Sequence, residues 1–250
     1  MSDDNKPRLW GIGIGPGEPE LLTLKAHRLI RKADIVFAPK ARIKGNSLAL
    51  DIVKGAGLKD ISYNEIEFPM ITNKQKLKYK WDAAAQYVID QLGENRTGVF
   101  ITLGDPGIYS TWTYLQQALD RKESNLKTGT VPGISTMNAA AAALGQPLLT
   151  GNEKLALLPL PWDLHELKTY IQLFDTLVIY KVASRLEELT ILLEQWGLAE
   201  QAALIHRVGL PEEKIFPVLT GLHKKSDGYL STVIVHCKKS TKQEEYKKYS

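Results

Sequence analysis

The sequence has one cysteine, Cys237, in 250 residues. A single thiol excludes an internal disulfide and a structural zinc site built on several thiolates. The five histidines are scattered along the chain without the spacing of metal ligands. The sequence therefore predicts no protein-bound metal.

Long apolar runs are also missing. No stretch approaches the roughly 18–20 consecutive apolar residues that a membrane helix needs. The first residues, MSDDNKPRLWG, carry acidic side chains and no apolar segment of the kind found in secretory signals. We therefore expect a cytoplasmic protein that does not bind membranes.

The chain has only a small excess of positive charge, and most of it lies at the C-terminal end. The formal net charge is +4, and the last thirteen residues, 238–250, contribute five lysines and two glutamates to it. The rest of the chain is close to neutral, whereas nucleic-acid binding requires a basic face on the folded body. We interpret segment 238–250 as a solvated basic tail and expect no nucleic-acid partner.

What is present is the balance of a globular protein, with 44% hydrophobic and 24% charged residues. Strand-like and helix-like patterns alternate along the chain, which predicts an α/β fold. Gly145-Gln146-Pro147 is the best linker candidate. We therefore expect one domain over residues 1–146 and a second over residues 147–250.

The two halves differ in their strand patterns. In the first half, helices separate the strands, so we expect a mostly parallel sheet. In the second half, three strand-like runs follow one another with short turns, at Ala203–Val208, Ile215–Leu219 and Tyr229–His236. Closely spaced strands favour antiparallel pairing, so the second sheet is expected to be mixed.

A glycine-rich turn, Gly11–Gly17, follows the first predicted strand. With Asp34 further along the chain, it is reminiscent of a dinucleotide-binding fold, which would make the protein an NAD-dependent oxidoreductase. However, the spacing is G-x-G-x-G-P-G, and Pro16 and Pro19 lack the backbone N–H groups that a phosphate needs. The turn thus favours a ligand other than a phosphate, and a tight turn without any ligand remains an alternative.

Three further turns carry chemistry-bearing residues. Thr102–Thr111 follows a buried strand and places Asp105 at its carboxyl end, or as the cap of a helix that begins near Ile108. Val131–Met137 is a second such turn, whereas Asp227–Thr232, with Tyr229, lies at the start of the last predicted strand. Because the carboxyl ends of parallel strands meet at one edge, we expect the turns Gly11–Gly17, Thr102–Thr111 and Val131–Met137 to outline one cleft. Tyr229 could project into the same space, or could be an aromatic residue packed on the surface at a strand edge.

These motifs, in this order, resemble the tetrapyrrole methylase family, the class III S-adenosylmethionine-dependent methyltransferases. The resemblance extends from about Leu9 to His236, and it rests on the glycine turn, on Leu21-Leu22-Thr23, on Gly104-Asp105-Pro106 and on Pro132–Ser135. Within the family, the chain is most similar to the branch that methylates carbon 20 of precorrin-2, or of its cobalt form, in cobalamin biosynthesis. The segments similar to that branch are Ser47–Leu50, Phe68–Met70 with Trp81, Thr102–Thr111 and Tyr229–Thr232.

The resemblance implies two αβα domains, a homodimer, a tetrapyrrole substrate, and S-adenosylmethionine held in a cleft between the domains, with S-adenosylhomocysteine as product. It also implies a set of residues that line the cofactor site. By position these are Pro16, Gly104, Asp105, Ile108, Tyr109, Ser135, Thr136, Lys181, Arg207 and Thr232.

The resemblance also suggests roles in the reaction. Asp105 is the first candidate for a catalytic base or for holding the positively charged cofactor, and Tyr229 is the second candidate, with an orienting role. Lys40, Arg42 and Lys44 could bind carboxylates of the substrate, or could belong to a solvated loop. Methylation at a different ring carbon by another member of the family remains an alternative.

Overall fold

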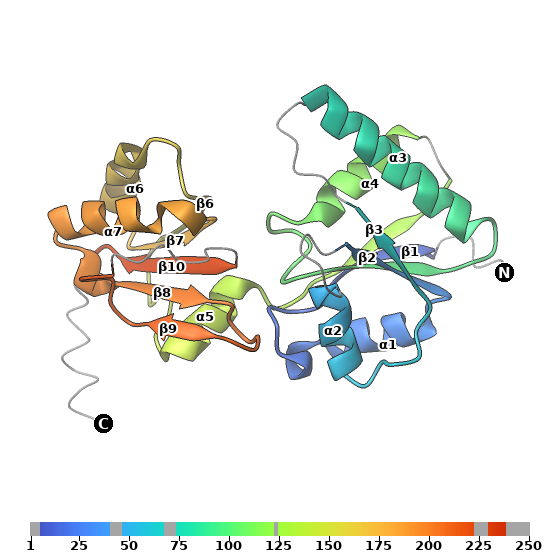
Figure 1. Ribbon diagram of the computed structural model, residues 1–250, viewed down its shortest axis with the longest axis horizontal. Coiled ribbons are helices and arrows are strands. Elements are labelled where there is room, and N and C mark those ends of the chain that lie inside the picture. The colour runs from blue at the N-terminus through green and yellow to red at the C-terminus, as the bar shows by residue number, and fades with distance from the viewer. Residues whose placement is uncertain (1–5, 41–46, 68–73, 123–124, 223–229, 239–250) are drawn as a thin grey trace. The chain divides into compact units, whose positions relative to one another are not determined.

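The computed structural model describes residues 6–40, 47–67, 74–122, 125–222 and 230–238. Contacts between Cα atoms divide the chain into two compact units, Met1–Ser135 and Thr136–Ser250. Each unit contains one five-stranded sheet with helices on both faces (Figure 1). The α/β fold expected from the sequence is confirmed.

The first unit is built on a sheet in the order β3-β2-β4-β1-β5, and all neighbouring strands pair in parallel. The strands are β1 (Leu9–Gly13), β2 (Ile35–Pro39), β3 (Tyr63–Ile66), β4 (Gly98–Thr102) and β5 (Thr128–Val131). Every residue of β4 is buried, as expected for a central strand covered on both faces.

Helices cover both faces of this sheet. They are η1 (Pro19–Leu21), α1 (Leu24–Lys32), α2 (Leu48–Gly55), α3 (Lys74–Leu92) and α4 (Thr111–Arg121). Helices α3 and α4 lie on one face, and α1 and α2 on the other (Figure 1). Thr23 caps α1, because its Oγ1 accepts a hydrogen bond from the backbone N–H of Ala26 at 3.2 Å.

The packing of α4 on the sheet depends on Gly11 of β1. The indole of Trp112 is 1% exposed, and its Nε1 donates to Oγ1 of Thr130 at 3.0 Å. A Cβ placed at Gly11 would lie 2.1 Å from two atoms of that indole ring. The first glycine of the turn motif is therefore required by packing within the unit, whatever the turn binds.

The second unit has a mixed sheet in the order β6-β7-β10-β8-β9. Strands β6 and β7 pair in parallel, and the other pairs are antiparallel, as the sequence predicted. The strands are β6 (Leu155–Pro159), β7 (Thr176–Tyr180), β8 (Ala202–His206), β9 (Lys214–Phe216) and β10 (Ser231–His236).

Helices of the second unit also lie on both faces. They are α5 (Thr136–Leu144), η2 (Leu164–Glu166), α6 (Leu167–Leu173), η3 (Ala183–Arg185), α7 (Leu186–Gln195) and η4 (Ala199–Gln201). Helix α5 packs against the face formed by Val178, Ile205 and Ile234, and α6 and α7 lie on the other face (Figure 1). Because α5 belongs to this core, the units divide at Ser135, whereas the sequence placed the boundary after Gln146.

Asp34 lies at the amino end of β2, whereas the glycine turn follows the carboxyl end of β1. Its Oδ2 accepts hydrogen bonds from the backbone N–H and the hydroxyl of Thr97, at 2.7 and 2.8 Å. These two bonds hold the pKa of the Asp34 carboxyl below its ordinary value of 3.8. Asp34 therefore does not support the dinucleotide-binding alternative, because the acidic residue that binds the ribose in that fold lies at the carboxyl edge of the sheet.

In the part of the chain that the structure describes, no helix has the length and apolar character needed to span a bilayer.

We predict that Gly11→Ala destabilises the protein by roughly 3 kcal/mol or more, because the new methyl group overlaps the buried Trp112 ring. Gly57→Ala is the control, since Gly57 has a φ of +86° but no heavy atom lies within 4 Å of the position that a Cβ would take. Its cost is expected to be that of the backbone conformation alone, roughly 1 kcal/mol. Equal urea midpoints for the two variants would contradict the packing role of Gly11.

We predict that Asp34→Asn lowers the thermal midpoint at neutral pH and that this difference shrinks below about pH 4. The pKa of Asp34 is lower in the folded chain than in the unfolded chain. The carboxylate therefore stabilises the fold above pH 3.8. This contribution is lost as the pH falls through the folded-state pKa. Thermal melts of both proteins at intervals of about 1 pH unit, from about pH 2 to about pH 7, measure the difference in thermal midpoint. A difference that does not depend on pH would contradict the stabilising role of the Asp34 carboxylate.

Candidate active site

Three turns that contain glycine follow β1, β4 and β5, which are neighbours in the first sheet. Because these strands are parallel, the turns meet at the carboxyl edge, where α/β sheets bind ligands. They span Ile14–Gly17, Leu103–Ser110 and Pro132–Ser135, and we name them the β1, β4 and β5 turns. The sequence predicted that these segments meet at one edge, and the structure confirms it.

The β1 and β4 turns are joined backbone to backbone. The N–H of Ile14 donates to the carbonyl of Thr102 at 3.0 Å, which continues the strand pairing. Beyond it, Gly15 and Gly104 form a bridge in which the N–H of Gly104 donates to Gly15 at 2.8 Å and the reverse bond measures 3.4 Å. Both glycines have positive φ, +81° and +66°, which a side chain would disfavour.

Gly13, Gly104 and Gly133 are pressed together where the three turns meet. A Cβ at Gly133 would lie 2.3 Å from the carbonyl oxygen of Gly104 and 2.7 Å from the carbonyl carbon of Gly13. A Cβ at Gly13 would lie 2.5 Å from the Gly104 oxygen. These three glycines therefore allow three backbone segments to approach one another closely.

Asp105 bridges two of the turns with its carboxylate. Its Oδ1 accepts from the N–H of Gly107 at 2.8 Å, and its Oδ2 accepts from the N–H of Gly133 at 3.0 Å. The expected helix start near Ile108 is wrong. Helix α4 begins at Thr111 because Ser110 caps it, with its Oγ accepting from the N–H of Trp112 at 3.0 Å.

Several backbone donors of this edge are used within the turns themselves. The backbone N–H groups of Gly15, Gly104, Gly107 and Gly133 all donate to other atoms of the turns. Pro16 has no N–H to offer. A pyrophosphate requires a row of such donors, so the edge does not have the chemistry of a dinucleotide site.

The remaining residues expected at the cofactor site from these segments surround the glycines. Pro16 and Ser135 are buried, Ile108 and Thr136 are half-buried, and Tyr109 is 49% exposed. Tyr109 also has a φ of 49°, which is unusual for a residue with a side chain. Such backbone strain is concentrated at functional sites in proteins.

In the second unit, the predicted residues Lys181, Arg207 and Thr232 lie at one edge of the mixed sheet. Lys181 and Arg207 directly follow β7 and β8, and Thr232 lies in β10 opposite Tyr180 and Ile205. Lys181 and Arg207 have φ of 60° and 54°. With Tyr109, they are three of the five described non-glycine residues with positive φ.

Two features of this second edge were missed from the sequence. The N–H of Arg207 donates to the carbonyl of Leu230 at 2.9 Å, and Leu230 itself has a φ of 67°. Nδ1 of His206 lies 2.9 Å from Oγ of Ser231. The sequence considered the histidines only as metal ligands, and no motif indicates this pairing, which arises from the antiparallel register of β8 and β10.

The other predicted residues fall in two groups. Lys40 is exposed directly after β2, and its backbone N–H donates to the carbonyl of Ile66 at 2.8 Å. Tyr229, Arg42 and Lys44 lie outside the described residues, as does the segment Phe68–Met70.

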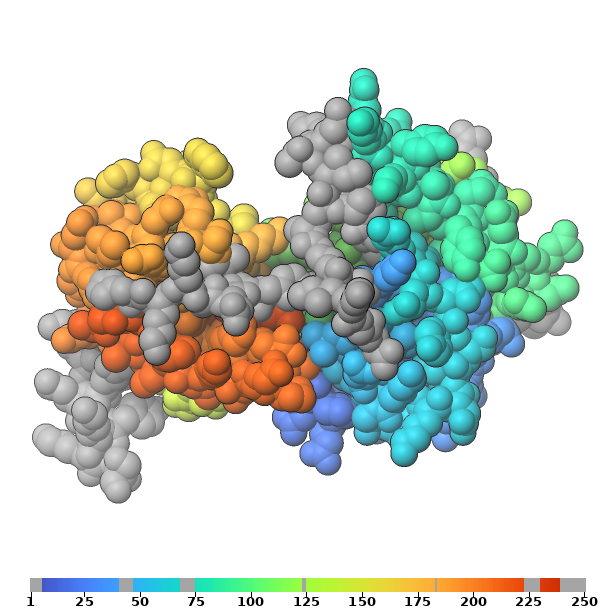
Figure 2. Space-filling model, viewed as in Figure 1, coloured from blue at the N-terminus to red at the C-terminus, as the bar shows by residue number. Residues whose placement is uncertain are grey.

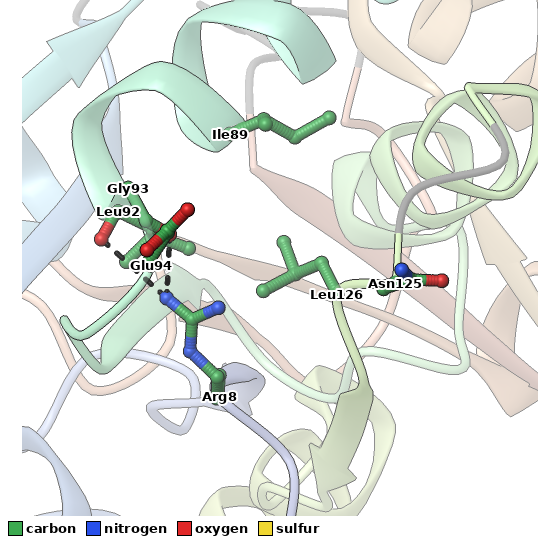
Figure 3. A pocket seen from close by; sticks show the side chains of 7 residues that line it. All are labelled: Arg8, Ile89, Leu92, Gly93, Glu94, Asn125 and Leu126. Carbon is green, nitrogen blue, oxygen red and sulfur yellow. Dashed lines mark hydrogen bonds between the residues drawn. The ribbon is translucent and has the colours of Figure 1, made fainter.

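A shallow hollow of about 280 Å³ lies at the opposite, amino edge of the first sheet (Figure 3). Arg8 forms one wall, and its Nη2 donates to the carbonyl of Gly93 at 2.7 Å and to that of Arg96 at 3.1 Å. Ile89 and Leu126 form the apolar part (Figure 3). The arginine secures the end of α3, and none of the predicted site residues lies in this hollow.

Elsewhere the described chain offers little chemistry. Burial raises the pKa of the Cys237 thiol to about 11, so this cysteine is protonated at neutral pH and is not a nucleophile. Among the described residues, no three histidine, cysteine, aspartate or glutamate side chains are grouped so that they could hold a metal ion. The edges described above are therefore the best candidates for the active site.

Known proteins resemble this chain over nearly its whole length. It is 36% identical over 208 residues to a probable cobalt-precorrin-2 C(20)-methyltransferase of Methanocaldococcus jannaschii, covering 83% of this chain and 86% of that protein. It is 32% identical to the cobalt-precorrin-2 C(20)-methyltransferase of Salmonella typhimurium, covering 96% of this chain and 98% of the relative. It is 30% identical to a precorrin-2 C(20)-methyltransferase of Sinorhizobium sp, covering 94% and 97%.

Solved structures share the fold at lower identity. A cobalt precorrin-4 methyltransferase matches with a TM-score of 0.68 at 18% identity, over 94% of this chain and 97% of that chain. A uroporphyrin-III C-methyltransferase from Thermus thermophilus, solved with S-adenosylhomocysteine, matches with a TM-score of 0.62 at 18% identity, over 91% and 96%. The family description "Tetrapyrrole (Corrin/Porphyrin) Methylases" matches residues 8–222. The chain therefore belongs to the tetrapyrrole methylase family.

Proposed function

We propose that this chain transfers a methyl group from S-adenosylmethionine to carbon 20 of precorrin-2 or cobalt-precorrin-2 in cobalamin biosynthesis. The observation that carries the proposal is the agreement of relatives at 30–36% identity, over most of their length, on one reaction at one carbon. The oxidoreductase alternative loses its two supports. Asp34 lies at the amino end of β2, and the N–H groups of Gly15, Gly104, Gly107 and Gly133 are used within the turns.

The residues at the predicted site fit a sulfonium nucleoside better than a dinucleotide. In the turns of the first unit, the N–H groups of Gly15, Gly104, Gly107 and Gly133 are already used, which disfavours a pyrophosphate as the ligand. The strained backbone at Tyr109, Lys181 and Arg207 falls at three of the ten positions where cofactor contacts were expected from the family resemblance. We propose that the residues predicted from the sequence, other than Asp105, bind the cofactor.

S-adenosylmethionine supplies an electrophilic methyl group on a sulfonium whose leaving group, a thioether, needs no acid catalysis. The protein's contribution is then to position the reactants and exclude water. In the first unit, Pro16 and Ser135 are buried among the turns of the carboxyl edge, so their positions are fixed by packing. We propose that Tyr229 orients the substrate, because a phenol is a weak base at neutral pH. Asp105 was also suggested as a catalytic base, and the comparison of Asp105 variants below tests that role.

The substrate proposed here is a tetrapyrrole that carries many carboxylates. Lys40, Arg42 and Lys44 follow β2, the neighbour of β4 on the side away from β1 and β5. Helix α3, which follows β3 at that end of the sheet, has exposed Lys76, Lys78 and Lys80 and no acidic residue in its first turn. Figure 2 shows the beginning of α3, in teal, at the surface of the first unit.

Positive charge at the N-terminus of a helix opposes the helix dipole and costs stability. An anionic partner offsets this cost. We therefore propose that the half of the carboxyl edge after β2 and β3 binds substrate carboxylates, and that the half after β4, β1 and β5 binds the cofactor. A homodimer and a cytoplasmic location also remain proposals, which rest on the family resemblance and on the sequence composition.

We predict that S-adenosylhomocysteine raises the thermal midpoint of the protein and that NAD does not, because only a ligand of the folded state stabilises it. At a ligand concentration about 100 times the dissociation constant, the stabilisation is about 2.7 kcal/mol. Thermal-shift measurements with both compounds at equal concentration provide the comparison. A shift with NAD alone would restore the oxidoreductase hypothesis.

We predict that incubation with methyl-labelled S-adenosylmethionine and precorrin-2, with and without cobalt, yields one product labelled at carbon 20. NMR of the isolated product locates the label. Samples that contain only one of the two substrates serve as controls. Label at another ring carbon would show that the chain is a different member of the family.

We predict that the double variant Lys78→Glu and Lys80→Glu raises the KM for the tetrapyrrole roughly fivefold or more and leaves the KM for S-adenosylmethionine unchanged. Exposed charges act over about 10 Å and are screened by salt, so the effect should weaken at high ionic strength. Lys32→Glu is the control, because Lys32 is an exposed lysine at the end of α1, near the amino edge of the sheet. Equal KM values in all three proteins would argue against the substrate surface.

A further inference from the structure

The β5 turn and the β4 turn are joined through a side chain. The β1 and β4 turns share backbone hydrogen bonds at Gly15 and Gly104, whereas the N–H of Gly133 in the β5 turn donates to Oδ2 of Asp105, at 3.0 Å. The other carboxylate oxygen accepts from the N–H of Gly107, at 2.8 Å, which closes the β4 turn around the aspartate. The carboxylate thus acts as a connector between segments 28 residues apart.

The backbone around this connector tolerates little movement. Gly133 lies so close to Gly104 and Gly13 that a Cβ would overlap both. A small shift of the β5 turn would therefore change the distance between the β4 turn and Ser135, two of the segments expected to line the cofactor site. The shape of this part of the edge depends on what holds Gly133 in place.

We propose that Asp105 is a positioning residue: its carboxylate holds the β5 turn against the β4 turn, and so sets the shape of the surface that binds S-adenosylmethionine. The inference rests on the proposed function for its ligand. In this view Asp105 is not a catalytic base. It connects two turns of the site, and it acts through its hydrogen bonds to Gly107 and Gly133.

Four roles for Asp105 make different predictions. A residue that only attracts the positive sulfonium weakens the binding of S-adenosylmethionine and leaves the binding of S-adenosylhomocysteine, whose sulfur is neutral, unchanged. A positioning residue alters the affinity for the cofactor in the absence of the tetrapyrrole and leaves turnover at saturating cofactor nearly intact. A catalytic base leaves the affinity unchanged, lowers kcat, and shifts the acidic limb of the pH profile of kcat. A residue needed only for folding lowers the fraction of active protein and leaves the affinity of the folded fraction unchanged.

The experiment compares the wild-type protein with Asp105→Ala and Asp105→Asn by calorimetric titration with S-adenosylhomocysteine. We expect the dissociation constant to rise about tenfold or more in both variants, because hydrogen bonds to a charged acceptor are lost. We expect kcat at saturating S-adenosylmethionine to stay within about threefold of wild type, with an unchanged pH profile. Asp120→Ala is the control, since it removes an exposed carboxylate of α4 in the same unit.

A second measurement needs no ligand. Amide hydrogen exchange at Gly133 should be faster in Asp105→Asn than in the wild-type protein and in Asp120→Ala, because the acceptor of that N–H is weakened. Asn has nearly the size of Asp and keeps one acceptor oxygen, so this variant tests the connection even if Asp105→Ala does not fold.

The outcomes separate this inference from the proposed function. If the wild-type protein binds no S-adenosylhomocysteine, the proposed function is wrong, and so is the proposal that Asp105 shapes a site for this cofactor. If the wild-type protein binds and both Asp105 variants bind equally well, with Gly133 exchange unchanged, the proposed function stands and the positioning role is overturned. A large loss of kcat at unchanged affinity overturns it in favour of the catalytic base.

Discussion

The close approach of three backbone segments at Gly13, Gly104 and Gly133 is the constraint on which the candidate site depends. Parallel pairing of β4, β1 and β5 brings the ends of these strands to one edge. The absence of side chains at the three glycines then lets the turns touch. Much of the hydrogen-bonding capacity of the turns is used to hold them together, and this limits which ligands the edge can accept. The close packing of the three glycines thus affects which ligands this edge can bind.

The glycine-rich motif shows why sequence spacing alone is ambiguous. Read as a pattern, Gly11–Gly17 is compatible with a phosphate-binding turn, with another ligand, or with no ligand. In the structure, Gly11 accommodates the Trp112 indole, Gly13 packs on Gly133, and Gly15 pairs with Gly104. Each of these three glycines is needed because of a residue distant in sequence, so the need for it could not be derived from the local sequence. The prolines were the informative residues, because the loss of an N–H is local chemistry that does not depend on the fold.

The elements themselves were largely predictable, for physical reasons that can be named. The alternation of buried strands with amphipathic helices gave the α/β class, the parallel first sheet and the mixed second sheet, and Thr23 marked the start of α1. The start of α4 was wrong by a few residues, since Asp105 and Ser110 are both good caps and tertiary contacts to Gly133 occupy Asp105. The strained residues Tyr109, Lys181 and Arg207 came from the family resemblance, because sequence patterns do not reveal positive φ at residues other than glycine.

The most direct test of the central claim is a crystal structure of the protein with S-adenosylhomocysteine. We expect the ligand against the β1, β4 and β5 turns at the carboxyl edge of the first sheet, with Gly15, Gly104, Gly107 and Gly133 keeping their hydrogen bonds within the turns. A ligand bound elsewhere, such as the hollow beside Arg8 at the amino edge, would contradict the account.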